Sequence, residues 1–455
     1  MPRSELGKKV GVFSHGGTKN LGDEALLATV IQNVRRRVPD AEVIGFTINP
    51  EDTQKRHGIL CYPIRSMEKS AASHDGERSV SVGEGDGKEP AAATHTGAVE
   101  SVKNGLKRVP GARALILAAR RVGRKLTAVL AEPGFLVASY RRLRGVKLLL
   151  VAGSQQLNDN WGGAWGFPYT LLKWAILCKL NGTKMAILSV GAGPISSSLS
   201  KFFIGRTLGL ADYRSYRDSA SSRLMESMGV KGSHPVFPDL VYSLQLPAAR
   251  PAPNGATRVV VGTNPVPFFD GRYWPTSDPQ RYEEYVNNFA RFAEWLSKSG
   301  HAVLFFPTQV RADVLTISDI RQAMNGAGDS SALPPAQPMQ TLDDLVSEIA
   351  RADFVVASRY HGILIPLAMN KPVLGVAYHE KCRALLEQVG QGDYVLEIED
   401  FTVEDMIERF QALEANAAAI RKQIAERMAS LRQALDQQYD AVFGLIGVKP
   451  TAEAP

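Results

Sequence analysis

Short apolar runs alternate with longer amphipathic stretches along most of this 455-residue chain. A short continuous apolar run is typical of a buried strand, whereas apolar positions three and four residues apart are typical of a helix that faces a core. In the first half of the chain the predicted strands are residues 8–14, 41–48, 58–62, 146–152, 185–190 and 213–216. The predicted helices there are residues 23–37, 166–180, 199–210 and 219–228, and residues 236–244 close this half.

The same alternation begins again after a proline-rich stretch. Predicted strands follow at residues 258–263, 302–307, 353–357 and 372–378, and predicted helices at residues 282–298 and 342–351. Strands that alternate with helices favour parallel sheets joined by right-handed crossovers. The expected fold is therefore α/β, with two Rossmann-like domains whose mainly parallel sheets face each other across a cleft.

These patterns also predict the domain boundaries. We expect an N-terminal domain at residues 1–246, a linker at residues 247–257 and a C-terminal domain at residues 258–400. Residues 401–455 are expected to form a helical tail that packs back on the body. The tail begins at Thr402, with an acidic residue three positions later, which is the spacing of a capping box.

An insertion at residues 66–143 differs in composition from the rest of the first domain. Residues 66–102 contain almost no large apolar side chain, which is typical of a disordered segment. Residues 103–147 then carry 12 Lys and Arg against the single Glu132, a local charge of +11. Since the whole chain carries +7, the remainder carries about −4, and the high pI of 9.2 belongs to one segment.

The basic segment has two interpretations that stay open. Its arginines gather on one side of an expected helix at residues 105–130, and apolar residues gather on the other side. Such a helix favours contact with an anionic membrane surface, but the same pattern suits a solvated lid or a helix packed on the sheet. Nucleic-acid binding is not expected, because no aromatic side chains interleave with the arginines.

Cysteine usage and hydropathy exclude several classes of protein. The three scattered cysteines, Cys61, Cys178 and Cys382, have no metal-ligand or redox spacing, so reduced thiols are expected. The chain has no apolar segment at its N-terminus and no run of about 18–20 apolar residues. We therefore expect a cytoplasmic protein, with attachment to the inner face of the membrane as an open alternative, and we expect neither a metal nor a cofactor.

Small and polar residues follow five of the predicted strands. Because the carboxyl ends of parallel strands lie at one edge of a sheet, these clusters are expected to line the cleft. They are residues 14–17 with 20–23, 153–159, 191–194, 217–219 and 358–361. The glycine-rich loop in the first cluster lacks the ending of a P-loop and the spacing G-x-G-x-x-G, so the nucleotide-binding fingerprints fail. Asp218 is interpreted as a helix cap and Asp239 as a turn former.

His361 has the most specific neighbours of any histidine in the chain. Arg359 precedes it and Lys381 follows the next predicted strand, so three nitrogen groups suited to an anion are expected on adjoining strand ends. The two cations are expected to lower the pKa of His361, and a bound polyanion to raise it and make the histidine a competent acid. The other histidines singled out show no metal-ligand spacing and are interpreted as structural: His15, His57, His234, His301 and His379.

The residues at these strand ends resemble the motifs of the polysaccharide pyruvyl transferase family. The resembling stretches are residues 17–27 (GTKNLGDEALL), 152–159 (AGSQQLND), 189–194 (SVGAGP), 215–219 (SYRDS), 358–361 (SRYH) and 378–381 (YHEK). The second stretch departs from the three glycines usual in the family, because Ala152 and Ser154 flank a single glycine. The resemblance spans about residues 10–390, without the insertion and the tail.

The resemblance implies a fold like that of the GT-B glycosyltransferases and an enzyme that depends on phosphoenolpyruvate. Such an enzyme transfers the enolpyruvyl unit onto two hydroxyls of one sugar, which yields a pyruvate ketal and phosphate in the synthesis of cell-surface polysaccharides. The resemblance further implies His361 as the general acid. It implies Arg217, Arg359 and Lys381 as ligands of phosphoenolpyruvate, which is a co-substrate here and not a cofactor.

The acceptor glycan is expected on the N-terminal domain, near Gly17, Asn20, Asp23 and Asp159. The sequence does not identify the sugar, its pair of hydroxyls, the ketal stereochemistry or the oligomeric state. The carrier of the acceptor also stays open, and it could be a lipid, a nucleotide or a polymer. Two other functions stay open. One is a nucleotide-sugar glycosyltransferase of the same fold, and the other is a non-catalytic protein that binds anions or glycans.

Overall fold

The computed structural model describes residues 8–66, 130–246, 258–274, 276–325 and 339–450. The chain divides into two compact units. One is Arg65–Arg142, of which the described residues 130–142 are helical, and the other combines Met1–Ile64 with Leu143–Pro455 and contains both sheets. Apart from residues 66 and 130, the predicted disordered segment, the predicted basic helix and the predicted linker lie outside the described residues.

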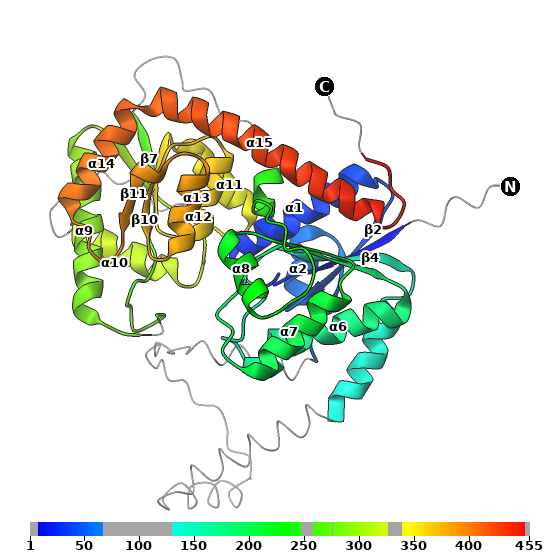
Figure 1. Ribbon diagram of the computed structural model, residues 1–455. Coiled ribbons are helices and arrows are strands. Elements are labelled where there is room, and N and C mark those ends of the chain that lie inside the picture. Colours follow the sequence, from blue (N-terminus) through cyan, green and yellow to red (C-terminus); the bar gives the residue numbers. More distant parts are fainter. Residues whose placement is uncertain (1–7, 67–129, 247–257, 275, 326–338, 451–455) are drawn as a thin grey trace, which may run out of the picture. The chain divides into compact units, whose positions relative to one another are not determined.

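Six parallel strands form the first sheet, in the order β3-β2-β1-β4-β5-β6 (Figure 1). They are β1 (Lys9–Phe13), β2 (Glu42–Thr47), β3 (Leu60–Pro63), β4 (Val146–Ala152), β5 (Lys184–Val190) and β6 (Tyr213–Tyr216). The inner strands β1 and β4 are buried on both faces, which is why their sequences are continuous apolar runs without alternation.

Helices α1 (Leu21–Arg37), α2 (Pro50–His57), α6 (Phe167–Asn181), α7 (Ser198–Leu210) and α8 (Ser219–Ser227) connect these strands. Figure 1 shows α1 and α6 on opposite sides of the sheet. The sequence pattern does not predict α2, because only Thr53 of this helix is buried and no apolar periodicity results. Residues 236–244 contain a bridge from Val236 to Tyr216 and a short 3₁₀ helix, Leu240–Ser243.

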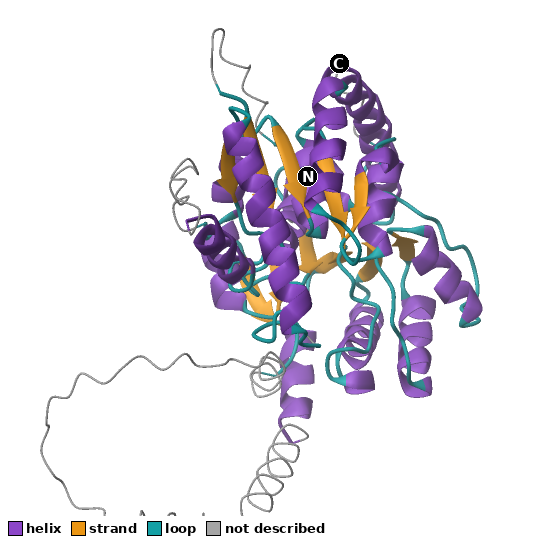
Figure 2. Ribbon diagram, turned by 90° about the vertical axis from the view of Figure 1, so that its left-hand side faces the viewer, coloured by secondary structure: helices purple, strands orange, loops and turns teal. Residues whose placement is uncertain are grey.

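Five parallel strands form the second sheet, in the order β11-β10-β9-β7-β8. They are β7 (Val260–Asn264), β8 (Ala302–Phe305), β9 (Phe354–Ala357), β10 (Val373–Ala377) and β11 (Val395–Glu397). The helices of this part are α9 (Pro279–Lys298), α10 (Asp313–Asn325), α11 (Leu342–Arg351), α12 (Tyr360–Ala368) and α13 (Glu380–Gln388), which pack outside the strands (Figure 2). The prediction of two parallel-sheet α/β domains is confirmed.

The last part of the chain forms two helices, α14 (Val403–Ala415) and α15 (Ala417–Gly444). Thr402 and Asp405 form the capping box that their spacing predicts. Helix α15 runs back to the first sheet, where the side chain of Gln438 donates to the hydroxyl of Ser189 at 3.2 Å. Among the described residues, no helix is both long enough and apolar enough to cross a bilayer.

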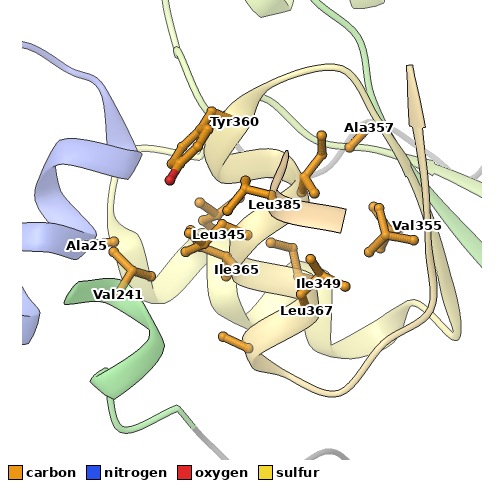
Figure 3. Close-up of a cluster of buried hydrophobic side chains, with 14 of the residues drawn as sticks. Ala25, Val241, Leu345, Ile349, Val355, Ala357, Tyr360, Ile365, Leu367 and Leu385 are labelled. Carbon is orange, nitrogen blue, oxygen red and sulfur yellow. The ribbon is translucent and has the colours of Figure 1, made fainter. Parts of the chain in front are cut away.

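A single hydrophobic cluster connects the two sheets. Figure 3 shows Ala25 of α1 and Val241 beside side chains of the C-terminal sheet, among them Ile365 of α12. Tyr360 lies at the edge of this cluster, and its hydroxyl is directed toward the side of Ala25 and Val241. Burial of these apolar side chains fixes the start of α12 next to α1, since removing apolar surface from water is the main favourable term in packing.

Candidate active site

Two loops pair with each other at the carboxyl ends of the sheets. The N–H of Leu21, after β1, donates to the carbonyl of Thr308, after β8, at 2.9 Å. The N–H of Val310 donates to the carbonyl of Lys19 at 3.4 Å. This pairing brings the first turn of α1 to the ligand-binding edge of the C-terminal sheet.

His361 lies in the first turn of α12 and packs directly against Gly22 in the first turn of α1. A Cβ atom at position 22 would lie 2.0 Å from Nδ1 of the imidazole, so glycine alone fits there. Burial, assisted by the charges of Arg217 and Lys381, lowers the pKa of His361 to about 4. The direction agrees with the sequence prediction, but the larger cause is burial and not the neighbouring cations.

The other imidazole nitrogen of His361, Nε2, is buried. It has no hydrogen-bond partner in the part of the chain that the structure describes. Buried polar atoms normally have a partner, because an unpaired one costs free energy. Nε2 is therefore the atom of His361 that is suited to exchange a proton with a bound molecule.

Arg217 directly follows β6 and reaches across to α12. Its guanidinium carbon lies 4.6 Å from the centre of the Tyr360 ring, and Nη1 lies 3.6 Å from Oδ2 of the buried Asp239. The hydroxyl of Tyr360 donates to the same carboxylate oxygen at 3.2 Å. A Cβ atom at Gly191 would lie 2.6 Å from Nη2 of Arg217. Packing, charge and hydrogen bonding thus hold this guanidinium in one position.

Lys381 lies in the first turn of α13, one turn beyond the strand end where the sequence places it. Its Nζ is 6.0 Å from the ring of Tyr360 and 3.5 Å from Oε1 of Gln155, which is a long hydrogen bond. Burial, followed by repulsion from Arg217, lowers the pKa of Lys381 to about 8. Within the described ranges no carboxylate forms an ion pair with Lys381. Its charge is therefore the least neutralised of the three predicted donor ligands.

Asp23 lies beside the contact between Gly22 and His361. Asn20, and not Asp23, caps α1: the side chain of Asn20 accepts from the N–H of Gly22 at 3.0 Å. The carboxylate of Asp23 instead accepts from the hydroxyl of Ser154 at 3.1 Å. Burial raises the pKa of Asp23 to about 6, although the bond from Ser154 opposes this shift. A carboxylate with this pKa is suited to accept a proton near neutral pH.

Arg359 has a protein partner of its own. Its Nε and Nη2 donate to the same oxygen of Asp313, at 2.9 and 2.6 Å. The other oxygen of Asp313 accepts from the N–H groups of Thr308 and Gln309, at 3.0 and 2.8 Å. Arg359 thus holds the loop after β8 in place, and its role as a donor ligand stays a prediction.

Two of the predicted acceptor residues also have protein partners. The N–H of Gly17, a residue with a φ of 86°, donates to Oε1 of Glu24 at 2.8 Å. Asp159 accepts from the N–H groups of Ser196 and Ser197, at 2.9 and 3.0 Å. These bonds outweigh burial and lower the pKa of Asp159. Acceptor binding by Gly17, Asn20 and Asp159 stays a prediction.

The five other histidines that the structure describes make contacts within the protein. His57 lies 2.7 Å from Glu24, His301 lies 2.9 Å from Glu414, and His379 caps α13. The other two are His15, which stacks on Phe167, and His234, which contacts Tyr216. In the described part of the chain no group of three or more His, Cys, Asp or Glu side chains is placed to hold a metal ion.

Sequence reasoning missed the roles of Asp239 and Tyr360. Asp239 is a turn former as predicted, since one of its oxygens accepts from the N–H of Val241 at 3.1 Å. Its other oxygen, however, faces Arg217 and Tyr360. The available signal was a single carboxylate within the otherwise apolar residues 237–242.

A hollow of about 270 Å³ lies away from this cluster. It is lined by α1, α2 and the start of α11, and it includes Arg35, Arg56 and Thr341. Among the charged groups that line it, Arg56 pairs with Asp52 and His57 pairs with Glu24, each at 2.7 Å. The candidate active site is the cluster around His361, where the charge of Lys381 acts on the buried imidazole and, in the described residues, no carboxylate forms an ion pair with this lysine.

This chain matches a known protein family. A sequence model of the family described as polysaccharide pyruvyl transferase matches residues 20–380. This range includes His361, Arg217 and every strand of the two sheets except β1 and β11. Among curated protein sequences, none matches this chain.

Solved structures with similar folds share little sequence with this chain. A putative UDP-N-acetylglucosamine 2-epimerase from Listeria monocytogenes has 11% identity and a TM-score of 0.54, over 99% of this chain and 100% of that one. The UDP-GlcNAc 2-epimerase from Neisseria meningitidis has 10% identity and a TM-score of 0.52, over 96% and 99%. The N-terminal domain of a trehalose-6-phosphate phosphatase from Candida albicans has 12% identity and a TM-score of 0.52, over 98% of each chain. These similarities show a GT-B-like fold.

Proposed function

Because this chain belongs to the polysaccharide pyruvyl transferase family, we propose that it transfers the enolpyruvyl unit of phosphoenolpyruvate onto two hydroxyl groups of one glycan sugar. The products are a cyclic pyruvate ketal and phosphate. The proposal depends on one observation above all: the buried, unpartnered Nε2 of His361, which lies under the influence of Arg217 and Lys381.

The donor carries a carboxylate and a phosphate, so its ligands must be cationic. Lys381 supplies an ammonium group that no carboxylate neutralises in the described part of the chain, and Arg217 supplies a planar guanidinium fixed by Asp239. Arg359 adds positive charge, although Asp313 neutralises part of it. These groups come from both sheets, and binding of the donor therefore bridges the two domains.

His361 becomes an acid only when the donor is bound. A unit negative charge about 4 Å away contributes about 4 kcal/mol at an effective dielectric constant of about 20, which corresponds to about three pKa units. One phosphate charge at this distance would return the pKa of His361 from about 4 to near neutrality. The imidazolium then gives its proton to the methylene carbon of the donor, which creates an oxocarbenium-like centre.

The acceptor hydroxyl attacks this centre, and a base must take its proton. Asp23 is suited to this step, because its carboxylate has a pKa of about 6 and follows the residue that contacts His361. The second hydroxyl then displaces phosphate and closes the ketal ring. Of the two hydroxyl protons, one replaces the proton delivered to the methyl carbon and the other leaves with phosphate, so the reaction is balanced.

The proposal includes the setting of the reaction. Phosphoenolpyruvate is a cytoplasmic metabolite, and we infer that the enzyme acts in the cytoplasm on a glycan destined for the cell surface. Contact with the inner face of the membrane through residues 105–130 belongs to the proposal as well. It is tested by co-sedimentation with vesicles before and after deletion of these residues, and unchanged co-sedimentation contradicts it.

The main test is incubation of the protein with phosphoenolpyruvate and a panel of glycan acceptors. We expect release of phosphate and an acid-labile mass gain of pyruvate minus water on the acceptor, both lost in His361→Gln. Release of UDP or GDP from a nucleotide sugar, without phosphate release, would support a glycosyltransferase instead. Binding without turnover, unaffected by His361→Gln, would support a non-catalytic binding protein.

A further inference from the structure

Large aromatic side chains are exposed beside the candidate active site. Trp161 and Trp165 are 60% and 62% exposed, and Phe202 is 56% exposed. Tryptophan is highly buried on average, so two exposed indoles four positions apart require an explanation. We call these three residues the aromatic strip.

The strip contacts the half-buried Tyr169 and the buried Phe203. Trp165 contacts Tyr169 and Phe203, with ring centres 5.3 and 5.6 Å apart, and Phe202 contacts Phe203 at 6.0 Å. The strip therefore continues from the loop after β4 across α6 to α7. Tilted and edge-on ring contacts support Trp165 and Phe202 from one side, and the guanidinium carbon of Arg206 lies 5.8 Å from the centre of the Phe202 ring.

The backbone between the two indoles is rigidly specified. A Cβ atom at Gly166 would lie 2.0 Å from the carbonyl oxygen of Trp161, and the N–H of Gly166 donates to Gly163 at 3.0 Å. Gly166 therefore cannot carry a side chain. A tight turn of this kind fixes the backbone that carries both indoles before any ligand binds, which reduces the entropic cost of binding.

One end of the strip lies at the same edge of the sheet as the candidate active site. Trp161 contacts His15, which follows β1, with ring centres 6.1 Å apart. The loop after β1 continues to Gly22 and Asp23, and the loop after β4 carries Ser154, the hydrogen-bond partner of Asp23. A polymer that presents one sugar to Asp23 would have its next sugars over this surface.

From these observations we propose that the aromatic strip is an extended subsite for the glycan acceptor, which binds sugars beyond the one that is modified. This inference rests on the proposed function for its ligand class. The apolar faces of sugar rings stack on aromatic rings, whose surfaces carry partial negative charge. Residues 153–167 include no Lys or Arg, so this part of the strip lacks the positive charge by which peripheral proteins bind anionic membranes.

The strip can be tested without the donor. On a glycan array, the wild-type protein is expected to bind oligosaccharides of three or more sugars. The double variant Trp161→Ala with Trp165→Ala is expected to bind them at least about tenfold more weakly, from the stacking energy of two rings. Trp165→Phe retains an aromatic ring and is expected to keep most of the binding. The control is Ile176→Ala, since Ile176 is also exposed on α6 but lies outside the strip.

Three outcomes would overturn the inference: no array binding by the wild type, equal binding by the double variant, or equal loss in the control. The double variant is checked for its melting temperature, and Trp165→Phe separates lost stacking from lost folding. A parallel experiment measures co-sedimentation with vesicles that contain anionic phosphatidylglycerol. If the double variant loses vesicle binding but keeps glycan binding, the aromatic strip is a membrane-binding surface. Array binding that depends on the strip, without phosphate release from phosphoenolpyruvate, would contradict the proposed function and leave the strip intact.

Discussion

Gly22 and His361 occupy adjoining space, with no room for a side chain between them. Gly22→Ala is therefore expected to displace the imidazole and to lower kcat by about 100-fold or more, since a misplacement of about 1 Å can cost this much. The same change in a helix ordinarily stabilises by about 0.5–1 kcal/mol, so lost activity would not simply follow from lower helix propensity.

The matched control for this variant is Gly209→Ala. Gly209 lies in α7, and no atom lies within 4 Å of a Cβ placed there. We expect it to keep full turnover. Steady-state kinetics and thermal melting of both variants decide the matter, and normal turnover by Gly22→Ala would show that the contact does not position His361.

Lys381 predicts how donor use depends on pH. Its ammonium group is protonated below a pKa of about 8 and favours the anionic donor only in that form. We expect kcat/KM for phosphoenolpyruvate to fall about tenfold per pH unit above this value. Lys381→Arg is expected to abolish this fall at high pH, which we call the alkaline limb of the pH profile, because arginine stays charged. The profile of kcat/KM is measured from pH 6 to about 10. Persistence of the limb in this variant would assign it to another group.

The raised pKa of Asp23 predicts a fall of kcat/KM at low pH, the acidic limb of the same profile. The carboxylate of Asp23 accepts a proton only above a pKa of about 6, so kcat/KM is expected to fall below this pH. Asp23→Asn is expected to lower kcat by about 10²–10⁴-fold and to abolish the limb. Ser154→Ala provides an internal check. The hydrogen bond from Ser154 lowers the pKa of Asp23, so its loss should move the limb to higher pH. A limb that stays in place after Ser154→Ala would exclude Asp23 as its source.

The ion pair of Arg37 with α15 is expected to contribute to the free energy of unfolding. The side chain of Arg37 is 1% exposed, pairs with Asp440 at 2.8 Å and lies 5.1 Å from the ring of Tyr439. Arg37→Met is expected to lower the free energy of unfolding by about 2–3 kcal/mol, less than for a fully buried pair because Asp440 keeps contact with water. Arg36→Met removes only an exposed pair with Asp436 and should cost less than about 1 kcal/mol. Urea denaturation of the two variants compares these values, and equal losses would contradict the prediction.

The sequence predicts the two sheets well because their inner strands are buried on both faces. It fails for α12, which is buried along almost its whole length and therefore has no polar face to reveal a helical period. It also fails for α2, whose single buried residue leaves no apolar pattern, although Asn49 and Pro50 encode its start. In both helices the apolar residues do not follow a helical period, because one helix is buried on nearly all sides and the other is almost entirely uncovered.

The sequence predicts which residues of the candidate site follow strands and therefore lie close together. The rule that parallel strands end at one edge brings His361, Lys381 and Arg217 together, as expected. The same rule does not predict the ion pair of Arg359. Its partner, Asp313, begins helix α10, which the sequence pattern does not predict. Which cations are neutralised inside the protein depends on contacts between segments distant in sequence, and these decide which of them is left for a ligand.

The backbone pairing between the loops after β1 and β8 has a consequence for the timing of the reaction. Bonds such as that from the N–H of Leu21 to Thr308 attach the loop that carries Asp23 to the C-terminal sheet. If the sheets part to admit a bulky glycan, these bonds break, and the acid and the base of the reaction separate with them. An open enzyme would then lack the proposed base Asp23 beside the proposed acid His361, so ketal formation would wait until the acceptor has been enclosed.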